Sequence, residues 1–193
     1  MYLSSCAKIQ TFSTGGIGGV HFGLNETLDI SQDLFSLSGT PQIVISAGIK
    51  AVLNIPKTYE MLETLGVTTL GYRTNEVPSF YSRSSGIKSL IKVRNASEIV
   101  RTFNYNSELC LNSATLVFNP IPPDDEIPKN EVDSFIAEAQ NQLKKENVFG
   151  KKTTPFLLDY VSKKTGGRSL RANIALALNN VRLGIQIAKT LAK

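Results

Sequence analysis

Short apolar runs separated by helical segments are the feature that most constrains how this chain can fold. The runs are rich in β-branched or aromatic residues and are bounded by turn residues; they comprise Ile9–Ser13, Gln42–Ser46, Val67–Tyr72 and Ser113–Phe118. This pattern predicts buried strands. Between them, Pro56–Leu65 and Ser97–Phe103 predict helices. Strands that alternate with helices predict an α/β fold, with a largely parallel or mixed sheet between helices in three α/β/α layers.

The last third of the chain predicts a C-terminal helical layer. Helical spacing of apolar residues covers Glu131–Asn147, Thr154–Lys163 and Ser169–Ala192. In the last of these segments, the residues at that spacing are Ile174, Leu178, Val181, Ile185 and Ile187. The stretch Asn119–Asp125 contains three prolines and predicts a loop between the sheet and these helices.

The start of the chain is unusual for a complete fold. Met1–Ala7 resembles the end of a helix that is already under way, and Lys8 leads into the first strand without a turn. We expect residues 1–193 to form one domain that lacks its N-terminal portion.

Composition narrows the classes of partner. The net charge of +5 comes from basic residues that are scattered rather than arranged in a stripe with stacking aromatics, so a nucleic-acid polymer is not expected and a small phosphorylated ligand is. Two cysteines, neither in a CxxC pair, argue against a disulfide framework or a thiolate zinc site. The apolar runs are too short to cross a membrane, and a signal-peptide pattern is missing, so a cytoplasmic protein is expected.

A glycine-rich segment, Thr14–His21, follows the first predicted strand. Its four glycines allow positive φ angles and a close approach of the backbone to a ligand, and exposed amide groups of this kind bind anions. The segment matches neither a dinucleotide fingerprint nor a P-loop. A generic phosphate site and a plain glycine turn both remain open. His21 is the only histidine of the chain, and it is either structural or a donor to the phosphate.

Two carboxylates and a hydroxyl follow in Asp29-Ile30-Ser31-Gln32-Asp33. Hard cations such as Mg²⁺ or Mn²⁺ take oxygen ligands, often one carboxylate together with waters and a substrate phosphate. The alternative is a capping box, in which Asp29 and Gln32 open a short helix and Asp33 lies in its first turns.

Lys50 comes directly after the second predicted strand, among apolar residues. The carboxyl ends of strands in α/β sheets are where ligands usually bind. Desolvation or a second cation would favour the neutral amine, which can attack an aldehyde and form a Schiff base. An ordinary surface lysine that opens a helix is the alternative.

Two further loops carry polar groups. Phe80–Gly86 combines hydroxyls with an arginine, and Gly166–Asn173 places Asn173 in the first turns of a helix, where its amide can pair with a pyrimidine edge. The alternatives are a mobile loop for the first and a helix start capped by Ser169 for the second.

Taken in order, these segments resemble the pseudouridine-5′-phosphate glycosidase, or indigoidine synthase A-like, family. The resemblance rests on TGGIGGVH, DISQDL, AGIK followed by LNIPKTYEMLETLGV, LGYRTNEVPSFYSRSSG, NPIP, GKKTTPFLL and TGGRSLRANIALALNNVRL. It implies an α/β/α fold and reversible cleavage of the C–C glycosidic bond of pseudouridine 5′-phosphate to uracil and ribose 5-phosphate, with Mn²⁺ as the metal. For a complete chain it also implies a homotrimer.

The resemblance assigns roles to particular residues. It makes Lys50 the nucleophile that bonds to C1′ of the ring-opened ribose and Asp29 the metal ligand. The remaining assignments are contacts with substrate, from Ser31, Gln32 and Asp33, from Thr14 and His21 near the phosphate, and from Asn173 near the uracil. Asp33 is in addition a candidate for proton transfer during ring opening.

The chain departs from the family pattern at three places. Phe22 stands where a basic residue is usual, and Asn75 where an acidic one is. The glutamate that donates a proton and a lysine that grips the substrate belong to the N-terminal portion and have no counterpart. Three readings are therefore open: part of a lyase whose whole chain is longer, a non-catalytic remnant of the family, and another Schiff-base enzyme such as a sugar-phosphate aldolase.

Overall fold

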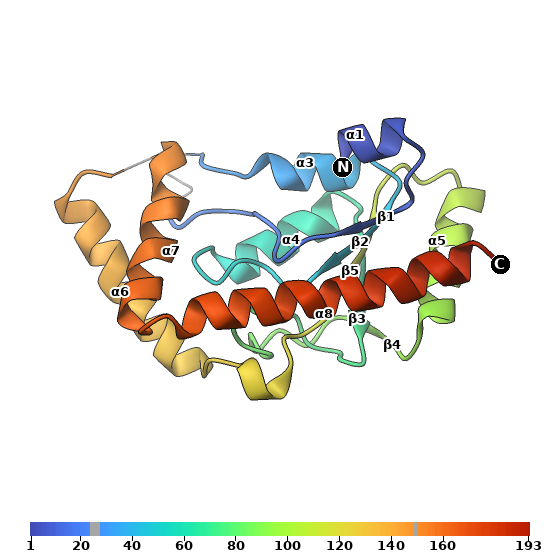
Figure 1. The fold of residues 1–193 in the computed structure, drawn as a ribbon. Helices are drawn as coiled ribbons and strands as arrows, with labels where there is room; N and C mark the ends of the chain where they lie inside the picture. Colours follow the sequence, from blue (N-terminus) through green and yellow to red (C-terminus); the bar gives the residue numbers. More distant parts are fainter. Residues whose placement is uncertain (24–27, 149) are drawn as a thin grey trace.

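A parallel sheet of five strands forms the centre of the molecule (Figure 1). The computed structural model describes residues 1–23, 28–148 and 150–193. In chain order the strands are β1 (Thr11–Ser13), β2 (Ile43–Ser46), β3 (Thr68–Tyr72), β4 (Ile91–Val93) and β5 (Thr115–Phe118). Each strand pair is parallel, and the spatial order is β1-β2-β5-β3-β4. The sequence predicted four of these strands and missed β4.

Side chains of the central strands alternate between two cores, as the pleat of a strand requires. Val44 and Leu116 point into one core, and Ile45 and Val117 into the other. Helices α3 (Gln32–Ser38) and α4 (Ile55–Thr64) line the first core, whereas α5 (Ala96–Glu108) and α8 (Arg168–Leu191) cover the second. The predicted three-layer α/β/α arrangement is confirmed.

The three helices predicted for the last third of the chain are confirmed, and α8 covers one face of the sheet. Helices α6 (Lys129–Lys145) and α7 (Thr153–Lys164) pack against each other beyond the end of the sheet, at the left of Figure 1. Two short 3₁₀ turns, Pro123–Asp125 and Gly150–Lys152, precede these two helices. The opening helix α1 (Tyr2–Cys6) has the place that the sequence predicted. No helix within the described residues has the length and apolar character needed to cross a bilayer.

Helix α8 has apolar side chains on two faces. The face toward the sheet buries Leu176, Leu183 and Ile187. A second row is 45–59% exposed and is called the outer stripe below; it consists of Leu170, Ile174, Leu178, Val181 and Ile185. Of the five apolar residues whose spacing predicted this helix, only Ile187 is therefore buried.

Helix starts agree with the sequence where an asparagine precedes the helix. Asn54 and Asn95 cap α4 and α5 by accepting hydrogen bonds from N–H groups of the first turn. Two predicted caps are wrong. Ser31, not Asp29, caps α3, because its hydroxyl accepts from the N–H of Asp33. Helix α8 begins after Gly167, which has φ 82°, so Ser169 lies inside the helix and is buried.

Candidate active site

The predicted site residues gather at the carboxyl ends of β1 and β2. Thr14 follows β1 directly, and Lys50 lies four residues after β2 ends at Ser46. This is the edge of an open parallel sheet at which ligands bind.

Backbone pairing between two loops fixes the place of Lys50. Ile17 donates its N–H to Gly48 at 3.1 Å, and Lys50 donates its N–H back to Ile17 at 3.1 Å. The glycine segment therefore continues the β1–β2 pairing as a parallel bridge between Ile17 and Ile49. Lys50 is held beside the glycine segment and five residues before α4 starts, so it does not open a helix.

The glycines of this segment allow close packing rather than unusual backbone angles. Gly15, Gly16, Gly18 and Gly19 all lack positive φ, contrary to the expectation from sequence. A Cβ on Gly18 would lie 2.2 Å from the Ser31 hydroxyl, and a Cβ on Gly19 would lie 2.3 Å from Thr58. These contacts are closer than real Cβ atoms make, so the hydrogen atom of glycine lets α3 and α4 approach the segment.

Several amides that could have formed an anion site are used inside the protein. The N–H of Gly18 donates to the Asp33 carboxylate at 2.7 Å, and that of Val20 donates to the Thr58 hydroxyl at 2.9 Å. The N–H of His21 donates to the carbonyl of Asp29 at 3.1 Å. The predicted phosphate site therefore cannot use these three amides.

Asp33 joins the start of α3 to the glycine segment. Its carboxylate accepts the bond from Gly18, and the helix cap from Ser31 fixes its own backbone N–H. Gln32, the first residue of α3, is exposed. The structure thus brings Ser31 and Asp33 to the edge of the site by a local helix start.

His21, Asp29 and Lys50 lie close enough to act on one another electrostatically. Burial lowers the pKa of His21 below its ordinary value; the negative charge of Asp29 raises it, and the positive charge of Lys50 lowers it. The net direction is downward, so the imidazole of His21 is neutral near pH 7. Its Nε2 lies 3.2 Å from the hydroxyl of Thr154 in α7.

Lys50 is half-buried between fully enclosed neighbours. Ile49 and Val52 have no exposed surface, whereas the lysine remains partly accessible. None of the salt bridges among the described residues involves Lys50. A lysine held by its backbone, with its amine not tied to a carboxylate, is suited to nucleophilic attack.

Helix α8 brings Asn173 to the same edge. Its side-chain oxygen lies 3.4 Å from the position that a Cβ on Gly15 would take. Asn173 is exposed in the first turns of the helix. Gly15 and Asn173, 158 positions apart in the chain, thus lie side by side at this edge.

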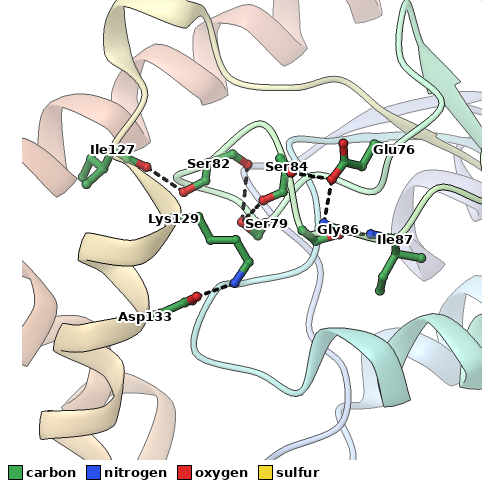
Figure 2. Close-up of polar contacts among 10 residues, drawn as sticks. Glu76, Ser79, Ser82, Ser84, Gly86, Ile87, Ile127, Lys129 and Asp133 are labelled. Carbon is green, nitrogen blue, oxygen red and sulfur yellow. Dashed lines mark hydrogen bonds and ion pairs between the residues drawn. The ribbon is translucent and has the colours of Figure 1, made fainter.

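The loop Phe80–Gly86 packs against the glycine segment through Phe80. Hydrogen bonds within this loop and to its neighbours hold it in place (Figure 2). The ring of Phe80 would meet a Cβ on Gly16 at 2.4 Å. Ser82 donates to the carbonyl of Ile127 at 2.6 Å, and Glu76 accepts from the hydroxyl of Ser84 and from the N–H of Gly86. These contacts tie the loop to the rest of the protein.

Two residues of the site escaped prediction from the sequence. Thr154 contacts His21 across 133 positions, and Thr58 anchors Val20 from α4. In the sequence, these two threonines are distinguished only by lying in the stretches GKKTTPFLL and LNIPKTYEMLETLGV, which carry the family resemblance.

Metal ligands are sparse. Among the residues that the structure describes, no three His, Cys, Asp or Glu side chains gather closely enough to hold a metal ion. Asp29, which is partly buried beside His21, fits a hard cation only in the mode that uses one carboxylate and completes its sphere with waters and substrate oxygens.

The fold and the site together define an α/β protein with a lysine and polar side chains at the carboxyl edge of a parallel sheet, the edge at which proteins of this class bind ligands. The comparisons make this specific. A family model described as indigoidine synthase A like protein matches residues 1–190. The chain belongs to the indigoidine synthase A-like family.

Curated relatives carry a common name. A pseudouridine-5′-phosphate glycosidase of Jannaschia sp. (strain CCS1) is 46% identical over 191 residues, which is 99% of this chain and 63% of the relative. One of Methylobacterium nodulans is 47% identical over 185 residues, 96% of this chain and 55% of the relative. The chain thus spans less than two thirds of the length of these relatives.

Solved structures share the fold. An indigoidine synthase A-like protein of Thermotoga maritima superposes with a TM-score of 0.90 at 38% identity, over 100% of this chain and 63% of the other. The prealnumycin C-glycosynthase AlnA, in complex with ribulose 5-phosphate, gives 0.94 at 31% identity, over 99% and 63%.

Proposed function

We propose that this chain carries the lysine-bearing face of a pseudouridine-5′-phosphate glycosidase, a lyase that reversibly converts pseudouridine 5′-phosphate to uracil and ribose 5-phosphate. The observation that supports this most is the half-buried Lys50, held beside His21 and Asp29 at the ligand-binding edge of the sheet. The relatives of that name support the substrate.

The bond to be broken explains the need for a lysine. A C-glycoside has no leaving oxygen or nitrogen that a carboxylic acid could protonate, so glycosidase chemistry with two carboxylates does not suffice. In the direction of synthesis, the neutral amine of Lys50 adds to the C1′ aldehyde of open-chain ribose 5-phosphate and loses water to form an imine. Uracil then adds to C1′ through C5 and loses the C5 proton. The 4′-hydroxyl finally attacks C1′ and displaces the Lys50 amine, which closes the ribose ring and frees the lysine.

Cleavage runs the same steps backwards. The nitrogen lone pair of the Lys50 adduct forms the C1′=N bond while the C1′–C5 bond breaks, and C5 of uracil takes a proton. Asp33, accepting from Gly18, is the proposed group for proton transfer at the ring oxygen. The neutral imidazole of His21, together with Thr14, is proposed to donate to the phosphate, and Asn173 to the uracil edge.

The proposed metal is Mn²⁺, held by the Asp29 carboxylate with waters and substrate oxygens. When bound, it would neutralise charge on the substrate phosphate. We expect Mn²⁺ titrated into the chain with ribose 5-phosphate to bind at least about tenfold more weakly after Asp29→Asn, because a charged ligand is lost. Electron paramagnetic resonance of free Mn²⁺ measures this, and Glu146→Gln, which changes an exposed carboxylate just after α6, is the control. Equal binding by both variants would remove Asp29 from the metal site.

The assignment of Lys50 is tested by trapping the imine. Borohydride reduction in the presence of ribose 5-phosphate should add one reduced pentose phosphate to the chain, and peptide mass spectrometry should place it on Lys50. Lys50→Ala should abolish the adduct. Lys57→Ala is the matched control, because Lys57 is an exposed lysine of the neighbouring helix α4. Equal labelling of Lys50→Ala and the wild type would show that the nucleophile is another residue.

The AlnA relationship supports a second candidate, C-glycoside formation with an acceptor other than uracil. Both candidates use the same imine, so the acceptor distinguishes them. Prolonged incubation with ribose 5-phosphate and uracil should slowly give pseudouridine 5′-phosphate for the first candidate, whereas a chain that forms a C-glycoside with another acceptor but not with uracil would favour the second.

A further inference from the structure

A pair of buried asparagines links α8 to the carboxyl ends of two strands. Asn180 has no exposed surface and Asn119 is 5% exposed. The amide nitrogen of Asn119, just after β5, donates to the side-chain oxygen of Asn180 at 3.0 Å. The amide nitrogen of Asn180 donates to the carbonyl of Thr14 at 2.7 Å and lies 3.3 Å from that of Gly15.

Burying the two asparagine side chains costs free energy of folding unless each of their polar groups has a hydrogen-bond partner. Asn180 lies on the face of α8 that otherwise buries Leu176, Leu183 and Ile187. An apolar residue there would leave the Asn119 amide and the Thr14 carbonyl without these partners, and a buried polar group that loses its partner is destabilising. Asparagine is also a weak helix former. Packing alone therefore does not explain this residue.

The bonds of Asn180 end on the proposed site. Thr14 and Gly15 begin the glycine segment that holds Lys50, and Asn173 lies against Gly15 from the same helix. Asn173 and Asn180 are seven residues apart, about two helical turns, so they share one face of α8. The side-chain bonds of Asn180 thus tie the start of the glycine segment to the helix that carries Asn173.

We propose that Asn180, held in orientation by Asn119, is a positioning residue of this site: it sets the affinity for the sugar phosphate by fixing Thr14–Gly15 and Asn173, and not the reactivity of Lys50. This inference rests on the proposed function. Asn180 touches neither substrate nor Lys50 in this arrangement, so its effect passes through the groups that it holds.

The variant Asn180→Asp isolates the donor role. An aspartate has the same size and can still accept the bond from Asn119, but its carboxylate cannot donate to the Thr14 carbonyl. Burial favours the neutral acid, whose hydroxyl can donate again. The defect should therefore be largest at alkaline pH and should decrease as the pH falls.

The measurement is Lys50 trapping with cyanoborohydride over a range of ribose 5-phosphate concentrations, from pH 5.5 to 8. At pH 8 we expect Asn180→Asp to need about tenfold more ribose 5-phosphate than the wild type for half-maximal trapping. The rate at saturation should equal that of the wild type, and the ratio of half-saturating concentrations should shrink toward pH 5.5. A lower saturated rate with unchanged half-saturation would overturn the proposal.

Asn179→Asp is the matched control. Asn179 is the adjacent residue of α8 and donates to the carbonyl of Pro120 at 3.1 Å, away from the glycine segment. It should bind as the wild type does. Equal defects in both variants would mean that any aspartate here loosens α8, which contradicts a positioning role specific to Asn180.

Hydrogen exchange of the unliganded chain tests the same inference without the reaction. The amides of residues 14–20 should exchange faster in Asn180→Asp than in the wild type or Asn179→Asp at pH 8. If the wild type is not trapped, the proposed function fails, and exchange still decides the positioning role. Identical exchange in the three proteins would overturn it.

Discussion

At the scale of single residues, the environment of His21 links the stability of the fold to pH. Burial lowers its pKa, while an unfolded chain leaves the imidazole at its ordinary value near 6.5. Below that value the unfolded state binds a proton that the folded state does not, so the free energy of unfolding falls as the pH decreases. We expect His21→Gln to lose less stability than the wild type between pH 7 and pH 5, measured by urea denaturation.

A second variant checks that the pH dependence comes from His21 and not from its contact with Thr154. Thr154→Val removes the hydroxyl 3.2 Å from the imidazole but keeps the histidine, so the wild-type slope with pH should persist. A slope that is the same for His21→Gln and the wild type would mean that His21 is not the group that titrates.

The sequence predicted which residues of the site lie together but not how they are held. The strand end before Lys50 and the helix that carries Asn173 follow from local patterns, whereas the family resemblance assigned these two residues to the site. The cap by Ser31 and the packing role of the glycines depend on α3 and α4 lying against the glycine segment. Contacts between segments far apart in the chain, such as Thr154 with His21, have no local pattern.

At the scale of elements, α8 offers a direct comparison of its two apolar faces. Leu176 is fully buried, whereas Leu178, two residues later, belongs to the outer stripe and is 51% exposed. Leu176→Ala should lower the free energy of unfolding by about 2–5 kcal/mol, and Leu178→Ala by less than about 0.5 kcal/mol. Chemical denaturation of both variants measures this.

The outer stripe should also bind a hydrophobic dye, because exposed contiguous apolar surface does so. Leu178→Ser should reduce dye fluorescence of the folded chain. Full dye binding by this variant would mean that the dye binds elsewhere.

The sequence predicted the helices and strands with clear hydrophobic patterns and missed the strand at the edge of the sheet. The missed strand β4 is an edge strand of three residues in which Ile91 is 68% exposed and Lys92 is also exposed. A half-exposed edge strand lacks the apolar run that identifies a buried one. Four of the five residues that predicted α8 belong to the outer stripe. The prediction was still correct, because an exposed apolar face of a helix has the same 3.6-residue period as a buried one.

At the scale of the whole molecule, the shared length limits the expected activity. The chain spans 63% of the Jannaschia relative, and the family resemblance places the proton donor outside the matched part. We expect the chain to form the Lys50 imine but to release uracil from pseudouridine 5′-phosphate at least about 10²-fold more slowly than that relative. Chromatography of released uracil measures both proteins under the same conditions with Mn²⁺. Equal rates would place every group that the reaction needs within these 193 residues.

The position of β5 also sets an order for folding. β5 lies between β2 and β3 although it follows both of them in the chain and is the last of the strands in the described residues. Until Phe118 has left the ribosome, β2 and β3 each have an unpaired edge, and such edges are prone to wrong pairing. The candidate site forms later still, because the carbonyls of Thr14 and Gly15 accept hydrogen bonds from Asn180, which is synthesised after β5. During synthesis, Lys50 is therefore present well before the contacts that complete the candidate site around it can form.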